Sequence, residues 1–352
     1  MKVTLFKTLE NEAKSMEIYS DNITKGVSKD IEIKHYRPEM LHFKFGRLIT
    51  RFFIYPFKAR KQQGDINHII DQTYGHLTMM LNKKKTIVTC HDVIPLQDKK
   101  TSGNLLFRML FKFSISKIRK AARIITISEV VKKDILSFIK YDPDKIKVIH
   151  SFSCEDFSRF SDTEKKKLRV KYGLDKYKIV LHVGDYVAYK NFSTVLKTMA
   201  ELVKEDKNIK LVKVGSLSDE EERLVDTLKL KKHMVHVQDI SFKELINYYN
   251  IADCLVFVSY IGGWANPPLE AMCCGCPVVI SKDSSYEFIK EDGLLVEAFN
   301  IVKIKEAILI ILKDKKLRNK LIGDGYKKAR TLNKEKLAGE HEELYKEVYN
   351  EL

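Results

Sequence analysis

The chain has 352 residues, of which 44% are hydrophobic and 31% are charged, and its formal net charge is +16. This length exceeds the roughly 250–300 residues at which a single hydrophobic core stops growing, so we expect two domains of ordinary size. No run approaches the ~18 uninterrupted apolar residues of a membrane span, and acidic residues stand near the N-terminus where a signal peptide is apolar. We therefore expect a cytoplasmic protein rather than an integral membrane protein.

The six cysteines show no paired spacing, which agrees with a cytoplasmic location. Cys273, Cys274 and Cys276 form a cluster that suggests part of a metal site. However, no second pair of Cys or His residues at zinc-finger spacing accompanies it. We therefore expect neither a disulfide framework nor a metal.

Apolar runs alternate with helical patterns along the first 150 residues. Six runs are interpreted as strands: 2–6, 31–34, 66–70, 86–90, 123–128 and 146–149. Strands separated by helices of this length imply right-handed crossovers and a parallel sheet, with ligands bound outside the carboxyl ends of the strands. A second array of the same kind runs from about residue 175 to 330, after a polar and aromatic linker at 151–174.

Positive charge is concentrated in the first array. Residues 1–150 carry 29 Lys and Arg against 15 Asp and Glu, whereas residues 151–352 carry 34 against 32. Basic and aromatic residues interleave in 42–61 and in 105–120. One interpretation is docking on an anionic membrane surface, and an equally open one is a solvated basic face over a core stripe. No nucleic-acid-binding motif accompanies the charge, so we expect no nucleic acid partner.

The membrane interpretation names particular side chains. Those expected to insert are Phe43, Phe52, Phe53 and Phe107, and those expected to attract anionic lipid are Arg51, Lys58, Arg60, Lys61, Arg108 and Lys112.

Polar residues follow two predicted strands of the first array. His91 and Asp92 come directly after the strand at 86–90, where a functional role competes with that of a structural histidine. Ser128 ends the next strand and is a favourable N-cap for a helix that begins at Glu129. We therefore assign Ser128 to capping and keep Glu129 as a candidate for acceptor binding.

A strand, a turn and a helix open the second array. The apolar run 179–183 ends at Gly184, Asp185 and Lys190 follow, and the next helix has Asn191 or Ser193 as its cap. This arrangement would place Lys190 at the mouth of a ligand crevice.

The segment 262–281 encodes a loop, a short helix and a buried strand. Asn266 is a favourable N-cap, Pro267 suits the first helical position, and Gly275 can end the helix in the left-handed conformation. The N–H groups of Leu269 and Glu270, at the positive end of the helix dipole, favour an anion such as a sugar-nucleotide diphosphate. Glu270 would accept ribose hydroxyls. Taken alone, such a helix start is equally compatible with a purely structural role.

Together with the intervening segments 211–215, 235–245 and 249–259, these two motifs resemble the donor-binding domain of the retaining GT-B glycosyltransferases of the family 4 type, also called glycosyl transferases group 1. The resemblance implies an α/β protein with two Rossmann-like doubly wound parallel-sheet domains facing a cleft. Residues 1–150 would bind the acceptor and 175–330 the donor, and a helix in 331–352 would cross back to the first domain.

The resemblance also implies an activity: transfer of a sugar, with retention, from a UDP-, GDP- or other NDP-sugar to a hydroxyl of a glycan or lipid-linked acceptor. No cofactor and no metal would be needed. The implied catalytic residues are His91 and Asp92. The implied donor-binding residues are Gly184, Asp185, Lys190, Asn191, Gly215, Asp239, Ile240, Asn266, Pro267, Leu269 and Glu270.

Three positions depart from the family pattern. Gly262 replaces the first of two glutamates eight positions apart, Asp185 stands where many members have Arg, and residues 8–15 replace a glycine-rich loop. A non-catalytic GT-B-like module that binds sugar nucleotides is therefore an alternative. The presence of His91, Lys190 and Glu270 together favours the enzyme.

Overall fold

The computed structural model describes residues 1–10, 12, 14–98, 100–101, 103–264, 266–282, 287–289 and 291–352. Ala265, within the 262–281 segment, and Asn11 and Ala13, within the 8–15 loop, lie outside the described residues. The chain divides into two compact units. The N-unit comprises Met1–Ser153 with Leu332–Leu352, and the C-unit comprises Cys154–Thr331.

The N-unit contains a six-stranded parallel sheet, and each strand lies within two residues of its predicted bounds. The strand order is β2-β1-β3-β4-β5-β6, a doubly wound order of the flavodoxin-like kind. The strands are β1 (Lys2–Phe6), β2 (Glu32–Tyr36), β3 (Ile66–Ile69), β4 (Thr86–Cys90), β5 (Arg123–Thr126) and β6 (Ile146–Val148).

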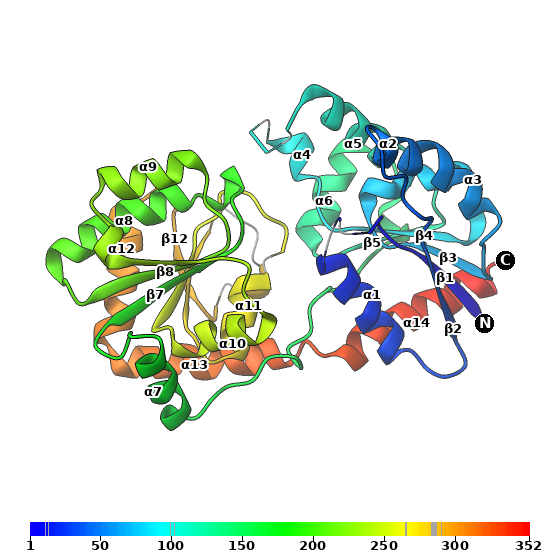
Figure 1. The fold of residues 1–352 in the computed structure, drawn as a ribbon. Coiled ribbons are helices and arrows are strands. Elements are labelled where there is room, and N and C mark those ends of the chain that lie inside the picture. The colour runs from blue at the N-terminus through cyan, green and yellow to red at the C-terminus, as the bar shows by residue number, and fades with distance from the viewer. Residues whose placement is uncertain are drawn as a thin grey trace. The chain divides into compact units, whose positions relative to one another are not determined.

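Helices cover both faces of the N-unit sheet (Figure 1). One face carries α1 (Lys14–Gly26) and α14 (Lys334–Asn350). The other carries α2 (Gly46–Ile49), the π-helix η1 (Thr50–Ile54), α3 (Tyr55–Arg60), the 3-10 helix η2 (Gln72–Met79) and α5 (Leu105–Ile118). Shorter or peripheral elements are η3 (Lys83–Lys85), α4 (Ile94–Gln97), α6 (Glu129–Phe138) and η4 (Pro143–Lys145).

The last helix, α14, belongs to the core of the N-unit. Leu337, Leu344 and Val348 are buried in the same apolar cluster as strand residues such as Val3. Two buried histidines also form hydrogen bonds between this helix and its neighbours. Gly26 of α1 approaches Ala338 so closely that a Cβ at Gly26 would lie 2.5 Å from the Ala338 Cβ.

The two histidines are His68 on β3 and His341 on α14. The His68 Nδ1 lies 2.7 Å from the Tyr345 hydroxyl, and its Nε2 lies 2.7 Å from the Thr89 hydroxyl. The His341 Nε2 lies 2.7 Å from the Tyr19 hydroxyl. Burial lowers the pKa of His341 to about 4 and that of His68 well below its ordinary value, so both rings are held in their neutral form.

The C-unit has a second six-stranded parallel sheet, in the order β12-β11-β10-β7-β8-β9. This is the Rossmann order, in which the connection reverses direction between β7 and β10. The strands are β7 (Lys178–Val183), β8 (Ile209–Val214), β9 (Met234–Val237), β10 (Cys254–Phe257), β11 (Val278–Ser281) and β12 (Leu294–Val296). The predicted fold class, two doubly wound parallel-sheet domains, is confirmed.

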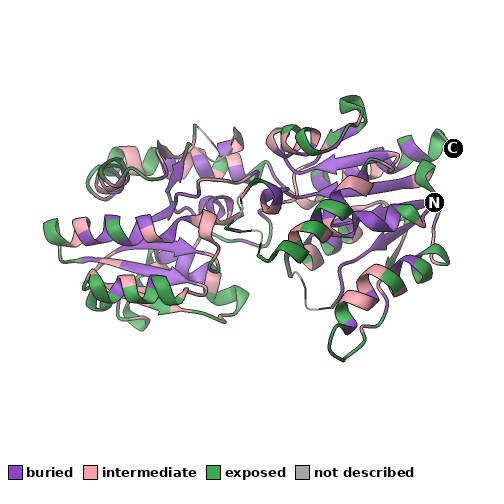
Figure 2. Ribbon diagram, turned by 90° about the horizontal axis from the view of Figure 1, so that it is seen from above, coloured by how far each residue is buried: buried purple, intermediate pink, exposed green. Residues whose placement is uncertain are grey.

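Helices also cover both faces of this sheet (Figure 1), and the central strands β7, β8, β10 and β11 are almost entirely buried (Figure 2), whereas the edge strands β9 and β12 are only partly buried. One face carries α8 (Phe192–Glu205), α9 (Asp219–Thr227) and α12 (Ile301–Lys313). The other carries α7 (Asp162–Lys171), α10 (Phe242–Ile251), α11 (Asn266–Cys273) and α13 (Lys315–Arg330). The short helices are η5 (Ala188–Lys190), η6 (Lys231–His233) and η7 (Glu287–Ile289).

The segment 151–174, expected to be a linker, differs from that expectation over most of its length. Residues 162–171 form α7, whose N-terminus has a capping box made by Ser161 and Glu164. Phe157 is buried, with its ring 5.2 Å from that of Phe242. Aromatic residues in this segment therefore pack into the C-unit, because burying them removes apolar surface from water.

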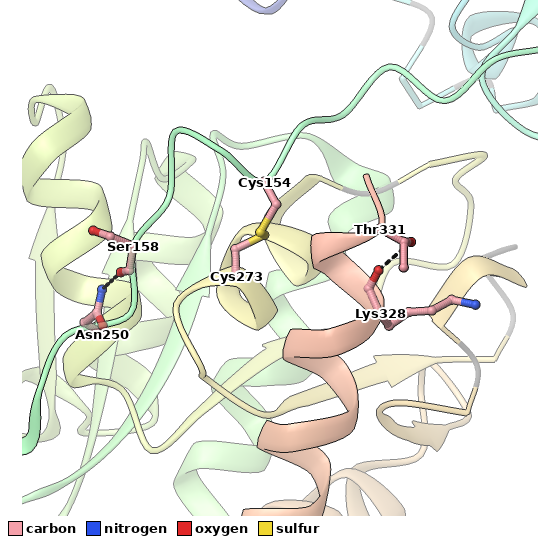
Figure 3. Close-up of a disulfide and its surroundings, with 6 residues drawn as sticks. All are labelled: Cys154, Ser158, Asn250, Cys273, Lys328 and Thr331. Carbon is pink, nitrogen blue, oxygen red and sulfur yellow. Dashed lines mark hydrogen bonds between the residues drawn. A yellow bond between two sulfur atoms is a disulfide. The ribbon is translucent and has the colours of Figure 1, made fainter. Parts of the chain in front are cut away.

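The expectation of no disulfide is wrong. Cys154 is bonded to Cys273, 119 residues away in the sequence, and their Cα atoms lie 5.8 Å apart (Figure 3). The bond joins the segment that enters the C-unit to the C-terminal end of α11. Cys273 therefore pairs with a distant cysteine and not with its neighbours in the cluster. The remaining cysteines, Cys90, Cys254, Cys274 and Cys276, are free and buried.

Candidate active site

Two glycine turns meet at the carboxyl edge of the C-unit sheet. Gly184 follows β7 with φ 132°, and Gly215 follows β8 with φ 99°. A Cβ at Gly215 would lie 2.7 Å from the carbonyl carbon and oxygen of Gly184, so only glycine allows this approach of the two backbones. The turn after β7 also lies next to β10, at the point where the strand order reverses. In open α/β sheets this is where ligands bind.

Lys190 lies across the first of these turns. Its Nζ donates a hydrogen bond to the Asp185 carbonyl oxygen at 3.1 Å, and a Cβ at Gly184 would be only 2.6 Å from the same Nζ. Burial lowers the pKa of Lys190, because a charged ammonium loses part of its hydration there. The structure thus places a partly desolvated cation against the glycine turn.

A second cation, which the sequence analysis missed, lies beside the same turn. Lys213 on β8 is almost fully buried, and its Nζ donates hydrogen bonds to the carbonyl oxygens of Gly184 and Val214. Burial lowers the pKa of Lys213 to about 8. The available signal was a lysine inside an apolar strand, two positions before the strand-end glycine. A lysine on a buried strand is rarely there without a function for its charge.

Asp185 joins the two turns. Its carboxylate accepts hydrogen bonds from the Ser216 backbone N–H at 3.0 Å and from the Ser216 hydroxyl at 3.2 Å. These bonds lower the pKa of Asp185 and keep it ionised. Where many members of the resembled family have a cation, this chain has an anion that holds the turn after β8 in place.

Asn191 occupies the predicted N-cap position of α8, but its side chain does not make the capping hydrogen bond expected of it. Its backbone is left-handed, with φ 56°. The side-chain amide instead donates hydrogen bonds to the carbonyl oxygens of Val258, at 3.2 Å, and Ala298, at 2.7 Å. It therefore connects the ends of β10 and β12 to the start of α8. These segments are far apart in the sequence, so the local sequence does not predict the contact.

Asp239 and Ile240 follow β9 at the same edge of the sheet. Asp239 is exposed and left-handed, with φ 54°. The helix α10 begins directly after these two residues, with a capping box made by Ser241 and Glu244.

The helix α11 begins at Asn266, one residue earlier than predicted, and the N-cap role assigned to Asn266 is wrong. Its Oδ1 is buried and has no hydrogen-bond partner in the described part of the chain. An N-cap oxygen usually accepts from the second or third helical N–H. Under the predicted numbering the second position is Pro268, which has no N–H. Because Pro267 also lacks one, Leu269 carries the first N–H inside the helix after Asn266.

The other end of α11 agrees with the prediction. Gly275 is left-handed, with φ 73°. The Cys276 N–H donates to the Ala271 carbonyl at 2.8 Å, and the Gly275 N–H donates to the Met272 carbonyl at 3.0 Å. These two bonds form a Schellman motif.

Glu270, one turn into α11, accepts a hydrogen bond from the Tyr249 hydroxyl of α10 at 2.5 Å. Burial raises the pKa of Glu270 to about 7, and the Tyr249 bond opposes that rise. Tyr249 was recognised as part of a family-like segment but not as the partner of this carboxyl group.

In the N-unit, His91 is buried directly after β4. Its Nε2 lies 2.9 Å from the Ile70 carbonyl oxygen and therefore carries the proton, and its backbone N–H donates to the Gln72 side chain at 2.9 Å. The Tyr19 ring packs edge-on against it. Burial lowers the pKa of His91, so the imidazole is neutral.

The other N-unit candidates lie at neighbouring strand ends. The Asp92 carboxylate accepts a hydrogen bond from the Ile94 N–H at 3.1 Å, and burial raises the pKa of Asp92 to about 6. The Ser128 hydroxyl accepts from the Val131 N–H at 3.2 Å, which confirms its assignment as the N-cap of α6. Glu129 is exposed in the first turn of that helix.

In the part of the chain that the structure describes, His, Cys, Asp and Glu side chains form no group of three or more that could hold a metal ion. Among the same residues, no helix has both the length and the apolar character needed to cross a membrane.

Comparison with known families accounts for both units. Residues 3–152 match the model described as Glycosyltransferase Family 4, and residues 164–328 match the model described as Glycosyl transferases group 1. The chain belongs to the group 1 glycosyltransferases.

Among curated relatives, this glycosyltransferase is similar to the O-antigen chain mannosyltransferase RfbU of Salmonella typhimurium. The two are 28% identical over 223 residues, which is 62% of this chain and 58% of the relative. The match thus spans less than two thirds of that relative. An uncharacterized glycosyltransferase of Methanocaldococcus jannaschii, MJ1069, is 24% identical over 380 residues, which cover 97% of this chain and 92% of that protein.

Among solved structures, the glycosyltransferase is similar to HepE from Anabaena in complex with UDP and glucose. The TM-score is 0.79 at 14% identity, with 98% of this chain and 99% of that chain covered. At this identity the similarity shows the fold alone, which is the GT-B fold expected from the sequence.

Proposed function

We propose that this glycosyltransferase moves a sugar, with retention, from a nucleoside-diphosphate sugar to a hydroxyl acceptor, and that the C-unit binds the donor. The observation that carries the proposal is the pair of cations, the half-buried Lys190 and the buried Lys213, beside the glycine turn at the carboxyl edge of the sheet. Two partly desolvated ammonium groups at a switch point favour a ligand with at least two negative charges. A nucleoside diphosphate meets that requirement.

The same groups would lower the barrier of the reaction electrostatically. Negative charge develops on the diphosphate as the sugar leaves, and cations already held in place stabilise it without reorganisation. Lys190 and the first free N–H groups of α11 are proposed to do this without a metal. Glu270 would accept the ribose hydroxyls. The structure of HepE, a neighbour with the same fold, in complex with UDP and glucose supports this proposal.

The remaining candidates are assigned from their positions at strand ends. His91, neutral and with its protonated Nε2 fixed by Ile70, is proposed to contact the donor sugar through the rest of the ring, with Asp92 beside it. Glu129 is proposed to contact the acceptor, because it is exposed at the next strand end.

We further propose that the acceptor is a glycan or a lipid-linked molecule at an anionic membrane surface. The relative RfbU, named for O-antigen chain synthesis, supports a glycan acceptor. The N-unit supports the membrane, because apolar side chains are exposed just before α2 and on η1, α3 and α5 among basic residues. These exposed side chains are Phe43, Phe45, Phe53, Phe57, Leu105, Leu106, Phe107, Met109 and Phe113. We call them, with their neighbouring Lys and Arg residues, the aromatic–basic surface.

Two residues expected in this surface point inward. Phe52 stacks on His76 of η2, with ring centroids 4.6 Å apart. The Arg51 guanidinium donates to the Thr73 carbonyl at 2.8 Å and lies 4.3 Å from the centre of the Tyr74 ring. Both side chains fasten η1 to η2, whereas Phe45 and Phe57, which were not named from the sequence, are exposed. Which side chains face outward depends on the number of residues per turn. The element η1 is a π-helix, whose residues per turn differ from those of an α-helix.

A thermal-shift panel tests the proposed donor. UDP, GDP and their sugars are each added at about 100 times their dissociation constant, where a specific ligand stabilises the folded protein by about 2.7 kcal/mol. At least one diphosphate should stabilise the protein, and Lys190→Ala should weaken its binding while the matched exposed variant on α8, Lys197→Ala, should not. Absence of any stabilisation, or equal binding by wild type and Lys190→Ala, would remove the proposed site.

A further inference from the structure

The C-unit contains a cavity that the proposed reaction does not use. Its volume is about 620 Å³, within the range of roughly 300–1,000 Å³ that is typical of small-molecule sites. Asp253 and Pro277, which line it, directly precede β10 and β11. The cavity therefore opens at the amino edge of the sheet, whereas Gly184, Lys190 and the start of α11 lie at the carboxyl edge. The remaining walls come from α7, α13 and the turn at Gly275.

The lining of this cavity is unusually basic. Five cationic side chains line it together with three aspartates. Two of the five are paired with one carboxylate: the Asp253 Oδ1 lies 3.0 Å from an Arg169 nitrogen and 3.9 Å from an Arg318 nitrogen. Arg169 also donates to the Ile251 carbonyl oxygen. These two arginines are thus engaged in holding the helices to the sheet.

The charged groups of the other three side chains, Arg159, Lys165 and Lys166, have neither an ion pair nor a hydrogen bond within the residues that the structure describes. Burial and the charge of Arg159 lower the pKa of Lys165, whereas the charge of Asp162, which also lines the cavity, raises it. Neighbouring cations that share a partly buried space repel one another unless an anion lies between them.

The backbone on both sides of Arg159 is held in place. The buried side-chain amide of Asn250 bonds on both sides of it: the Phe160 N–H donates to the Asn250 Oδ1 at 2.7 Å, and the Asn250 Nδ2 donates to the Ser158 carbonyl at 2.8 Å. Five residues before Arg159, the Cys154–Cys273 disulfide fastens the same segment to α11 (Figure 3). The Arg159 side chain then lies across the turn at Gly275, where a Cβ would be 2.9 Å from its Cδ and Nε.

We propose that this cavity is a second anion site of the C-unit, and that it binds the phosphate group of a phosphate monoester. A guanidinium fork and two ammonium groups match a phosphate dianion in charge and in hydrogen-bond donors. The cavity is larger than a phosphate ion requires, which leaves room for the organic part of a small metabolite. This site is independent of the proposed donor site, because the two share no side chain.

Titration calorimetry with two probes, inorganic phosphate and ribose 5-phosphate, tests the proposal. Wild type should bind both. Tighter binding of the ester would identify a phosphorylated metabolite as the ligand, and equal binding would identify free phosphate. Lys165→Gln should weaken binding by at least about tenfold, the usual effect of losing one charge-assisted bond. Arg159→Gln, which changes an exposed side chain, should do the same.

Matched controls locate the binding. Lys167→Gln removes the same charge from an exposed position of α7 that does not line the cavity, and it should change the affinity less than twofold. Lys190→Ala should leave phosphate binding intact even though it alters the donor site. The proposal is overturned if wild type binds neither probe at millimolar concentration, if Lys165→Gln and Lys167→Gln have equal effects, or if only Lys190→Ala abolishes binding.

Discussion

Glu270 is a carboxyl group whose charge depends on pH near neutrality. Burial raises its pKa to about 7, against the opposing effect of the hydrogen bond from Tyr249. If it accepts ribose hydroxyls, the ionised form makes the stronger, charge-assisted bond. Between pH 6 and pH 8 the affinity for the bound nucleoside diphosphate should therefore rise by roughly tenfold beyond the effect of the phosphate's own titration, following the ionised fraction of such a group.

Calorimetry at several pH values measures this affinity. Glu270→Gln should remove the extra pH dependence, and Glu270→Ala should weaken binding by roughly 10- to 100-fold. A 2′,3′-dideoxy nucleotide that binds as tightly as the natural one at pH 8 would show that Glu270 does not contact the ribose.

At the scale of elements, the Cys154–Cys273 bond connects the entry segment of the C-unit to the end of α11. It closes a loop of more than a hundred residues, and such bonds contribute about 2–4 kcal/mol to stability. Dithiothreitol should lower the melting temperature of wild type but not that of the Cys154→Ser/Cys273→Ser variant. Thiol titration of the denatured, unreduced protein should find four free thiols, and six would contradict the pairing.

The aromatic–basic surface is built from two segments that pack on the same element. Phe52 of η1 stacks on His76 of η2, and the His76 Nδ1 lies 3.1 Å from the Ser114 hydroxyl of α5. The elements η1, α3 and α5 therefore lie together on one face of the N-unit sheet (Figure 1). Exposed apolar groups together with basic ones supply the two signals that reversible membrane binding needs.

Co-sedimentation with phosphatidylglycerol vesicles measures that binding. Lys58→Gln/Lys61→Gln should weaken it by roughly thirtyfold, at about 1 kcal/mol per lysine near the surface. The matched C-unit variant, Lys315→Gln/Lys316→Gln, should not. Raised salt should weaken the binding of wild type, since charges are screened over about 8 Å at physiological ionic strength. Equal partition onto neutral and anionic vesicles would refute the docking proposal.

At the scale of the whole molecule, the N-unit should be the more acid-sensitive part. Burial lowers the pKa of His76 and of His341 to about 4 each, and that of His68 as well. The unfolded chain takes up protons near pH 6.5, so its free energy falls relative to that of the folded chain as pH decreases towards 4. From pH 7 to pH 5, His76 and His341 should each remove about 2 kcal/mol of stability, and His68 acts in the same direction.

The raised pKa of Asp92 works in the opposite direction, because the folded state gains its proton first, but it offsets only about 1 kcal/mol over this interval. In the C-unit the lowered pKa of His182 is opposed by the raised pKa of Glu270. Hydrogen exchange by mass spectrometry, corrected for intrinsic rates, should show protection of α14 falling more steeply with acid than that of α12. Equal loss in both helices would contradict this assignment.

Most strands were predictable because they are short apolar runs between turn signals, and a parallel sheet buries such runs on both faces. The edge strand β2 is more polar and has no fully buried residue. The glycines at 184, 215 and 275 were predictable for a related reason, since their positive φ is a local property. Hydrogen-bond and disulfide partners that are brought together by tertiary packing were not predictable. Lys213, Tyr249 and the amide of Asn191 bond to segments far away in the sequence, and Cys154 pairs across 119 residues.

We propose above that this glycosyltransferase activates a nucleoside-diphosphate sugar in its C-unit. Proton NMR of the donor selected by the thermal-shift panel tests it most directly, because most such enzymes slowly transfer the sugar to water. We predict release of the nucleoside diphosphate, with the free sugar first appearing in the anomeric configuration of the donor, and a rate at least tenfold lower for Lys190→Ala. A donor that binds and stays intact for as long as it does in buffer alone would contradict the claim and identify a binding module.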